Sequence, residues 1–220
     1  MLSRRFTDKA VRMAAAVLAT LAVAGCATPS FLDGVIEPQP GPAGADGMTP
    51  GAREVPPNVL TMFEQATAAM AGGDLVDAEL RFQEFVLQYP DYPGAWVNLA
   101  IIRAQDGNDA GAREALDAAL ALDPNHPAAL NQMGMLLRRN GDFLAAEAAY
   151  LKAVTVSPEY ALAHYNLGVL NDLYLQRLET ALQHFETYQT LVGEDQQVAK
   201  WIIDLKRRVE AAQRTANVAE

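Results

Sequence analysis

The sequence predicts an all-α protein, a solenoid of repeated helix-turn-helix units, and three observations lead to that prediction. From Val59 onward, Ala, Leu, Glu and Gln are frequent and apolar residues recur with helical periodicity. No segment there alternates apolar and polar residues as a half-buried strand would. Proline occurs at positions 90, 124 and 158, at intervals of 34 residues. A fixed period of this length indicates stacked units that share one continuous core.

Residues 1–25 have the three parts of an export signal. Four basic residues come first, an apolar core of 11 residues runs from Met13 to Val23, and the small residues Ala24 and Gly25 follow. The apolar core is shorter than the roughly 20 residues that a membrane-spanning helix needs. We therefore expect residues 1–25 to be a signal peptide that is removed on export.

Cys26 is the only cysteine and closes the run Val23-Ala24-Gly25-Cys26. This run resembles the lipobox of bacterial lipoproteins. The resemblance implies a diacylglycerol on the thiol of Cys26, cleavage just before it and acylation of the new amino terminus. The alternative is an incidental buried thiol behind a signal that is not lipidated. Ala27 stands where Asp retains enterobacterial lipoproteins at the inner membrane, so we expect a lipid anchor in the outer membrane that faces the periplasm.

Residues 26–57 are predicted to be a linker after the lipidated cysteine. Within residues 27–57 there are seven Pro and five Gly, and such a segment buries too little apolar surface to offset its ordering entropy. We interpret it as a tether, and an extended polyproline ligand is the alternative. The chain after residue 25 has 13 basic and 26 acidic residues, a net charge of −13, so nucleic acid and anionic head groups should repel it.

The proline period is accompanied by glycine turns and small residues. Gly-Asp or Gly-Asn pairs lie 17 residues before each proline, and alanines lie 12 residues before it. Glycine allows the turn a positive φ, the Asp or Asn can cap the second helix, and the proline ends that helix. The equivalent residues of the three units are Gly73-Asp74, Gly107-Asn108 and Gly141-Asp142 for the turns, and Ala78, Ala112 and Ala146 for the alanines.

These units resemble the tetratricopeptide repeat, a helix-turn-helix unit of 34 residues. The repeat region is predicted to be 58–194, with repeats at 59–92, 93–126, 127–160 and 161–194. The fourth repeat has no glycine in its turn at 175–178, which indicates a one-residue insertion. Residues 195–220 are predicted to be a capping helix and tail, with the helix from about Asp195 to Ala212. Its apolar stripe is Val198, Ile202, Leu205 and Val209, and its outward cations are Lys200, Lys206, Arg207 and Arg208.

Catalytic and metal-binding patterns do not emerge from the sequence. His126, His164 and His184 are isolated, and no HExxH, phosphate-binding glycine loop or GxSxG occurs. We therefore expect no enzyme activity, no cofactor and no metal.

The resemblance implies that the first helix of each repeat lines a concave groove that binds a protein partner. We expect an apolar wall edged by amides, with Arg138 and Arg139 meeting an acidic group. The alternatives are that the apolar residues pack against the neighbouring repeat and that the amides are structural. Only Asn98 matches the residues with which some family members clamp a terminal carboxylate, so such a clamp is not expected. The predicted groove residues are Phe63, Val97, Asn98, Ile101, Asn131, Gln132, Met135, Arg138, Arg139, Tyr165, Asn166 and Val169.

The predicted function is that of a membrane-anchored periplasmic adaptor that binds another envelope protein, as an extended peptide or otherwise. Small lipidated proteins of this architecture resemble assembly factors for type IV or Flp pili and secretion complexes, including pilotins. The alternatives are an adaptor for peptidoglycan enzymes and a self-associating structural scaffold. The motifs do not choose among them, because fold does not fix function.

Overall fold

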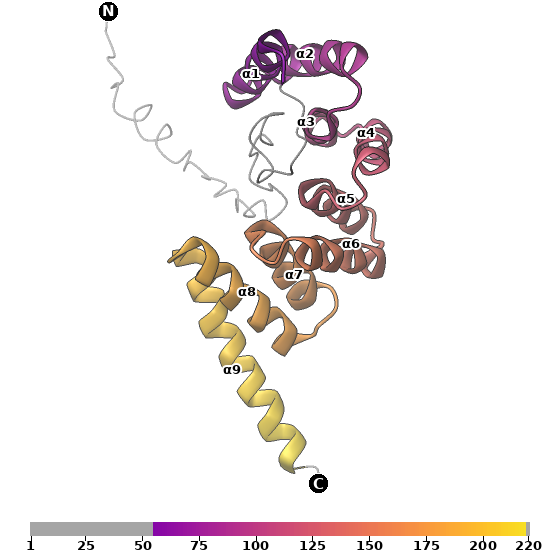
Figure 1. The fold of residues 1–220 in the computed structure, drawn as a ribbon. Helices are drawn as coiled ribbons and strands as arrows, with labels where there is room; N and C mark the ends of the chain where they lie inside the picture. Colours follow the sequence, from indigo (N-terminus) through magenta and orange to yellow (C-terminus); the bar gives the residue numbers. More distant parts are fainter. Residues whose placement is uncertain (1–54, 219–220) are drawn as a thin grey trace, which may run out of the picture. The chain divides into compact units, whose positions relative to one another are not determined.

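The computed structural model describes residues 55–218. The predicted signal peptide, Cys26 and the predicted linker up to residue 54 lie outside the described residues, as do residues 219–220. The described residues form nine α-helices and no strand, which is the all-α class that the sequence predicts (Figure 1). The helices are α1 Pro57–Ala71, α2 Leu75–Gln88, α3 Pro93–Gln105, α4 Asp109–Leu122, α5 Pro127–Arg139, α6 Phe143–Val156, α7 Ala161–Leu173, α8 Leu178–Val192 and α9 Gln196–Val218.

The first helix begins at Pro57, the residue that was predicted to end the linker. Proline is well placed at the first position of a helix, because its fixed φ suits the helix and its missing N–H would have no helical partner there. The same arrangement recurs at Pro93 in α3 and Pro127 in α5.

Glycine forms the turn inside each of the first three repeats, as predicted. Gly73, Gly107 and Gly141 have φ values of 79°, 76° and 86°, a region that favours glycine. In the fourth repeat the turn between α7 and α8 contains four residues instead of three, which confirms the insertion. Gln176 takes the positive φ there, at 54°.

Side-chain caps start two of the three second helices that were predicted to have them. Asp74 accepts a hydrogen bond from the backbone N–H of Asp77 at 3.1 Å, and Asn108 accepts one from Gly111 at 2.9 Å. Asp142 occupies the equivalent position of α6, but its side chain makes no capping bond, so the prediction fails for this helix.

The two helices of a repeat meet where the first helix carries a small residue. A Cβ on Gly134 would lie 2.5 Å from Cε1 of Tyr150, and one on Gly168 would lie 2.7 Å from Cδ1 of Phe185. Real Cβ atoms do not approach other atoms so closely, so glycine is required for these contacts. The tyrosine and phenylalanine rings fill the space that the missing side chains leave and are fully buried.

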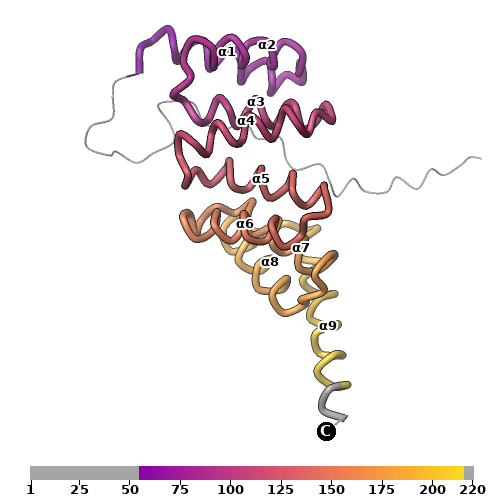
Figure 2. The backbone as a smooth tube through the Cα atoms, turned by 90° about the vertical axis from the view of Figure 1, so that its right-hand side faces the viewer, coloured from indigo at the N-terminus to yellow at the C-terminus, as the bar shows by residue number. Residues whose placement is uncertain are grey.

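Repeats stack so that their first helices lie on the inner side. Helix α3 contacts both α1 and α5, and α5 contacts α7, whereas no second helix between residues 55 and 218 contacts the second helix of the next repeat. Figure 2 shows the helix pairs following one another as successive layers. Helices that touch lie on the shorter, concave side, so α1, α3, α5 and α7 form the inner face of the stack.

Helix α9 covers the end of the stack and is longer than predicted. Its apolar stripe is buried, as expected, and packs on α8. The helix continues beyond Ala212 to Val218, because no glycine or proline follows to end it. None of the helices between residues 55 and 218 is long and apolar enough to cross a bilayer.

An ion pair joins each repeat to the next element of the stack. Exposed pairs of this kind contribute about 0.2–1 kcal/mol each, so their main effect is on the geometry of the junctions. The pairs are Arg103–Glu79, Arg139–Asp109, Arg177–Glu147 and Arg208–Asp172.

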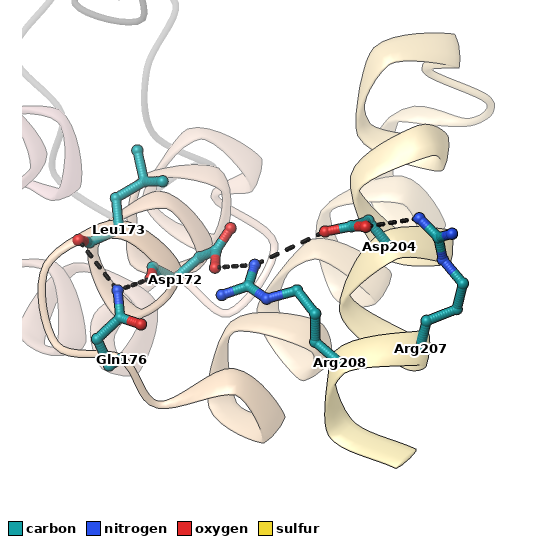
Figure 3. Close-up of polar contacts among 6 residues, drawn as sticks. All are labelled: Asp172, Leu173, Gln176, Asp204, Arg207 and Arg208. Atoms are coloured by element: carbon teal, nitrogen blue, oxygen red, sulfur yellow. Dashed lines mark hydrogen bonds and ion pairs between the residues drawn. The ribbon is translucent and has the colours of Figure 1, made fainter. Parts of the chain in front are cut away.

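The pair at the cap corrects the prediction that Arg208 faces outward. Its Nη1 lies 2.7 Å from Oδ1 of Asp172 on α7 and 3.8 Å from Oδ2 of Asp204 on its own helix (Figure 3). In the turn after α7, the side-chain amide of Gln176 donates a hydrogen bond to the backbone carbonyl of Asp172 at 2.8 Å. Arg207 pairs with Asp204 on the exposed side of α9.

Candidate protein-binding surface

The inner face offers fewer accessible side chains than the sequence suggested. Eight of the twelve predicted groove residues are buried, Arg139 is exposed, and Gln132, Met135 and Tyr165 are partly exposed. The eight buried residues are Phe63, Val97, Asn98, Ile101, Asn131, Arg138, Asn166 and Val169.

The apolar wall of the predicted groove is part of the core, which corrects that prediction. Phe63 stacks edge-on against Phe82 and Phe85, with ring centroids 5.6 and 5.5 Å apart. Val97 is fully buried and Ile101 is 6% exposed, both in the same cluster. Phe63 is buried by the second helix of its own repeat, and Val97 and Ile101 lie on α3, which contacts the first helices on both sides. Packing of these residues in the stack is the alternative considered for them from the sequence.

The amides on the inner helices bond to each other across the repeat boundary. Asn166 on α7 donates from Nδ2 to Oδ1 of Asn131 on α5 at 2.9 Å, and both side chains are buried. Asn98 is also buried. A buried amide must satisfy its hydrogen bonds, so Asn131 and Asn166 serve to join two repeats and are not free for a partner's backbone.

Arg139 does meet an acidic group, but that group belongs to its own chain. Its guanidinium pairs with Asp109 of α4 and donates to the backbone carbonyl of Ala104 at 2.7 Å. The side chain therefore joins the second and third repeats, and we remove it from the candidate surface.

Tyr165 lies against an aromatic cluster at the junction of α7, α8 and α9. Its ring centroid is 6.1 Å from that of Phe185, 5.3 Å from Tyr188 and 6.0 Å from Trp201. Burial raises the pKa of the Tyr165 hydroxyl, and the neighbouring carboxylate of Asp195 adds to this effect. Through this cluster Trp201 packs the cap onto the last repeat.

We define the inner-face surface as the three predicted residues that remain partly exposed, namely Gln132, Met135 and Tyr165. Gln132 and Met135 are three residues apart on α5, so they share one face of that helix. Tyr165 is on α7, the inner helix that contacts α5. The surface combines an amide, a flexible thioether and an aromatic ring, a composition that suits protein recognition.

Arg138 follows Met135 by three residues on α5, and its burial was not foreseen. The side chain is 6% exposed, and its guanidinium carbon is 5.9 Å from the ring centroid of Tyr174. Tyr174 directly follows α7, at a position where the first three repeats carry Gly72, Asp106 and Asn140. The replacement of a small or polar turn residue by an aromatic one is the only signal in the sequence that marks this contact.

His164 and His184 form a pair between α7 and α8. Their Nδ1 atoms are 3.1 Å apart, and Nε2 of His164 lies 3.0 Å from the carbonyl oxygen of Pro158. Because a carbonyl can only accept, His164 donates from Nε2 to Pro158, and its Nδ1 can accept from His184 when the ring carries no second proton. Within the described part of the chain, no group of three or more His, Cys, Asp or Glu side chains is arranged to hold a metal ion.

The fold and the inner-face surface define a helical-repeat protein of the kind that acts as a scaffold for protein–protein interactions. The sequence matches the model of the tetratricopeptide repeat family over residues 63–127 and 131–196, more than half of its length. The chain therefore belongs to the tetratricopeptide repeat family.

Individual proteins resemble parts of the chain. PilF of Pseudomonas aeruginosa superposes with a TM-score of 0.62 at 23% identity, covering 71% of this chain and 72% of that one. MamA from Desulfovibrio magneticus RS-1 gives a TM-score of 0.58 at 20% identity, covering 74% of this chain and 91% of that one. These likenesses show the fold. The human protein O-mannosyl-transferase TMTC2 is 38% identical over 82 residues, and the match spans 37% of this chain and about a tenth of that protein's length.

Proposed function

We propose that this protein is a lipid-anchored adaptor of the bacterial envelope that binds a segment of another envelope protein on the inner-face surface. The observation that carries the proposal is that neighbouring inner helices α5 and α7 leave Gln132, Met135 and Tyr165 partly exposed, while eight other predicted groove residues are buried and Arg139 is paired with Asp109. Amide, thioether and aromatic groups together recognise a peptide of mixed apolar and polar character.

The anchor is the second part of the proposal. The lipobox-like run before Cys26 supports lipidation, and the acidic charge of the remaining chain supports attachment through lipid instead of a basic surface. The long tether predicted between Cys26 and α1 would let the repeats reach partners away from the membrane. The outer membrane, facing the periplasm, is the location that Ala27 favours.

The machinery that we propose for this adaptor is a type IV or Flp pilus or a related secretion complex. The resemblance of the lipidated repeat architecture to assembly factors of such systems supports this choice, and the likeness to PilF is compatible with it. An adaptor for peptidoglycan enzymes is the alternative within the same class.

The test is capture of partners from envelope extracts by the wild-type protein and by two matched variants. Met135→Gln removes an apolar group from the inner face, and Leu144→Gln removes one from the outer side of α6, where Leu144 is 67% exposed. We expect Met135→Gln to lose the partners and Leu144→Gln to retain them, with circular dichroism showing that both fold. Loss of the partners in Leu144→Gln alone would assign binding to the outer side.

A self-associating scaffold remains a second candidate, and one observation favours it. Val76, Leu80 and Leu87 are 75%, 61% and 84% exposed, and their spacing of four and seven residues places them along one side of α2. Sedimentation equilibrium of wild type and Leu87→Gln tests it. A dimer that dissociates in the variant supports the scaffold, and a monomeric wild type excludes it.

A further inference from the structure

Arg138 differs from every other arginine between residues 55 and 218. That part of the chain contains nine arginines, and eight of them form an ion pair with an Asp or Glu. Arg138 forms none, although it is the most buried of the nine. Its Nε and Nη1 atoms are inaccessible to solvent and have no hydrogen-bond partner among the described residues.

The polar group that interacts with Arg138 on α6 is a hydroxyl and not an anion. The Tyr150 hydroxyl is buried and interacts with the guanidinium, although it forms no hydrogen bond of standard geometry among the described residues. Burial raises the pKa of Tyr150 to about 12, and the nearby positive charge of Arg138 opposes that rise. The Tyr174 ring and the guanidinium lie against each other, but contact with the face of an aromatic ring does not replace a hydrogen bond from an N–H group to an acceptor atom. This corner of the fold therefore holds a buried positive charge that forms no ion pair with any residue from 55 to 218.

Three carboxylates on helices that contact α5 form ion pairs with other cations. Asp172 is on α7, the helix beside α5, and pairs with Arg208 at 2.7 Å. Glu147 of α6 pairs with Arg177, and Asp109 of α4 pairs with Arg139. A buried charge without a counter-ion destabilises a fold, so an acidic chain with an unpaired buried arginine is unusual.

The repeat does not need a cation at this position. The equivalent residues of the first two repeats are Met70, which is buried and apolar, and Ala104. Packing in the third repeat could be met by a similar apolar side chain. The arginine is therefore better explained by a ligand than by the architecture.

We propose that Arg138 is the binding site for a carboxylate, supplied by an Asp or Glu side chain of the protein segment that docks on the inner-face surface. The Nε and Nη1 groups of Arg138 and the hydroxyl of Tyr150 donate to it. Tyr174 is 37% exposed and covers the guanidinium, so the carboxylate enters beside that ring. This inference rests on the proposed function and specifies the chemistry of the partner, which must be acidic at one point.

The first test uses the full chain and sodium acetate as the carboxylate probe. With the arginine side chains labelled with ¹⁵N, we expect acetate to shift the Nε–H resonance of Arg138, and sodium chloride of equal ionic strength to leave it in place. Thermal melts should show a higher midpoint in acetate than in chloride. Sodium phosphate serves as the competing anion. If acetate shifts the resonance no more than chloride does, the proposed site is wrong. If phosphate has a stronger effect than acetate, the site binds an anion other than a carboxylate.

The matched variants are Arg138→Met and Arg139→Met, which remove the same charge from neighbouring positions. Arg138→Met should lose the acetate effect, and Arg139→Met should keep it because its arginine is already paired. Without any ligand, Arg138→Met should melt at a higher temperature than the wild type. The change replaces an unpaired buried cation by methionine, which is the residue at the equivalent position of the first repeat, Met70. An acetate effect that persists in Arg138→Met would overturn the proposal.

The second test uses a peptide probe and separates this inference from the proposed function. A fluorescent peptide of alternating Leu and Glu should bind the wild type at least roughly tenfold more tightly than the same peptide with Gln for Glu, since hydrogen bonds to charged groups are the stronger ones. That preference should vanish in Arg138→Met. If the preference is absent while Met135→Gln still loses its envelope partners, the inner-face surface stands and the carboxylate site fails.

Discussion

Gly134 on α5 and Tyr150 on α6 form a contact that leaves no room for a side chain: a Cβ on Gly134 would be 2.5 Å from the tyrosine ring. Gly134→Ala should therefore displace the ring or separate the helices, and overpacking of this kind costs about 1–3 kcal/mol. We expect a lower free energy of unfolding in urea.

The second repeat supplies the control for this prediction. It places Ala100 and Leu116 at the positions of Gly134 and Tyr150. The double variant Gly134→Ala, Tyr150→Leu reproduces that pair and should lose less stability than the two single changes together. Strict additivity of the two changes would show that Gly134 and Tyr150 are not coupled.

The hydrogen bond between Asn166 and Asn131 should contribute to stability and not directly to partner binding. Asn166→Ala leaves the Oδ1 atom of Asn131 buried without its donor, which costs about 1–3 kcal/mol. Gln132→Ala, at a partly exposed amide, should stay within about 0.5 kcal/mol of wild type. Chemical unfolding of the two variants checks this, and equal stability of both would argue that the buried amide bond contributes nothing.

The histidine pair predicts that the protein loses stability in mild acid. Burial, and then the neighbouring His164, lower the pKa of His184 from 6.5 to about 4. Between these pH values the unfolded chain binds a proton at His184 that the folded chain does not bind. The free energy of unfolding therefore decreases as the pH falls from about 6.5 toward 4. Above about pH 6.5 the ring is neutral in both states, and His184 causes no such loss.

His184→Gln removes the titrating group and can still donate to Nδ1 of His164. The urea midpoint of this variant should change less between pH 7 and pH 5 than that of the wild type. If both proteins lose the same stability over this interval, His184 is not responsible for the pH dependence.

The helix boundaries were predictable because their causes are local in the sequence. Glycine at positive φ and proline after a helix act within a few residues, so a 34-residue spacing of Gly107, Gly141 and the prolines placed the turns correctly. The register also aligned Ala112 with Ala146, and both are buried.

Accessibility on the inner face was not predictable, because it depends on how closely neighbouring repeats approach. The helical register placed Val97 and Ile101 on the inner face, where they were expected to be accessible. Both are buried, on a helix that contacts the next inner helix. That Arg138 forms no ion pair with the described residues could not be predicted for a related reason. Asp172, an acid on the neighbouring helix, is occupied by Arg208 of α9, a helix outside the repeat pattern.

Lipidation at Cys26 is a prediction from the lipobox-like run and from Cys26 being the only cysteine in the sequence. Cys26→Ala should accumulate as unprocessed precursor or appear as soluble protein, and should not incorporate a labelled fatty acid. Membrane fractionation and acyl labelling check this. Labelling that persists in Cys26→Ala would place the lipid elsewhere and remove the basis for the anchor.

The central claim is that partners bind the inner-face surface formed by α5 and α7. The most direct measurement is photocrosslinking in living cells, with p-benzoylphenylalanine placed at Gln132 on the inner face or at Leu144 on the outer side of α6. We predict a discrete adduct with an envelope protein from position 132 and none from position 144. An adduct from position 144 with none from position 132, in protein that is folded and exported, would contradict the account.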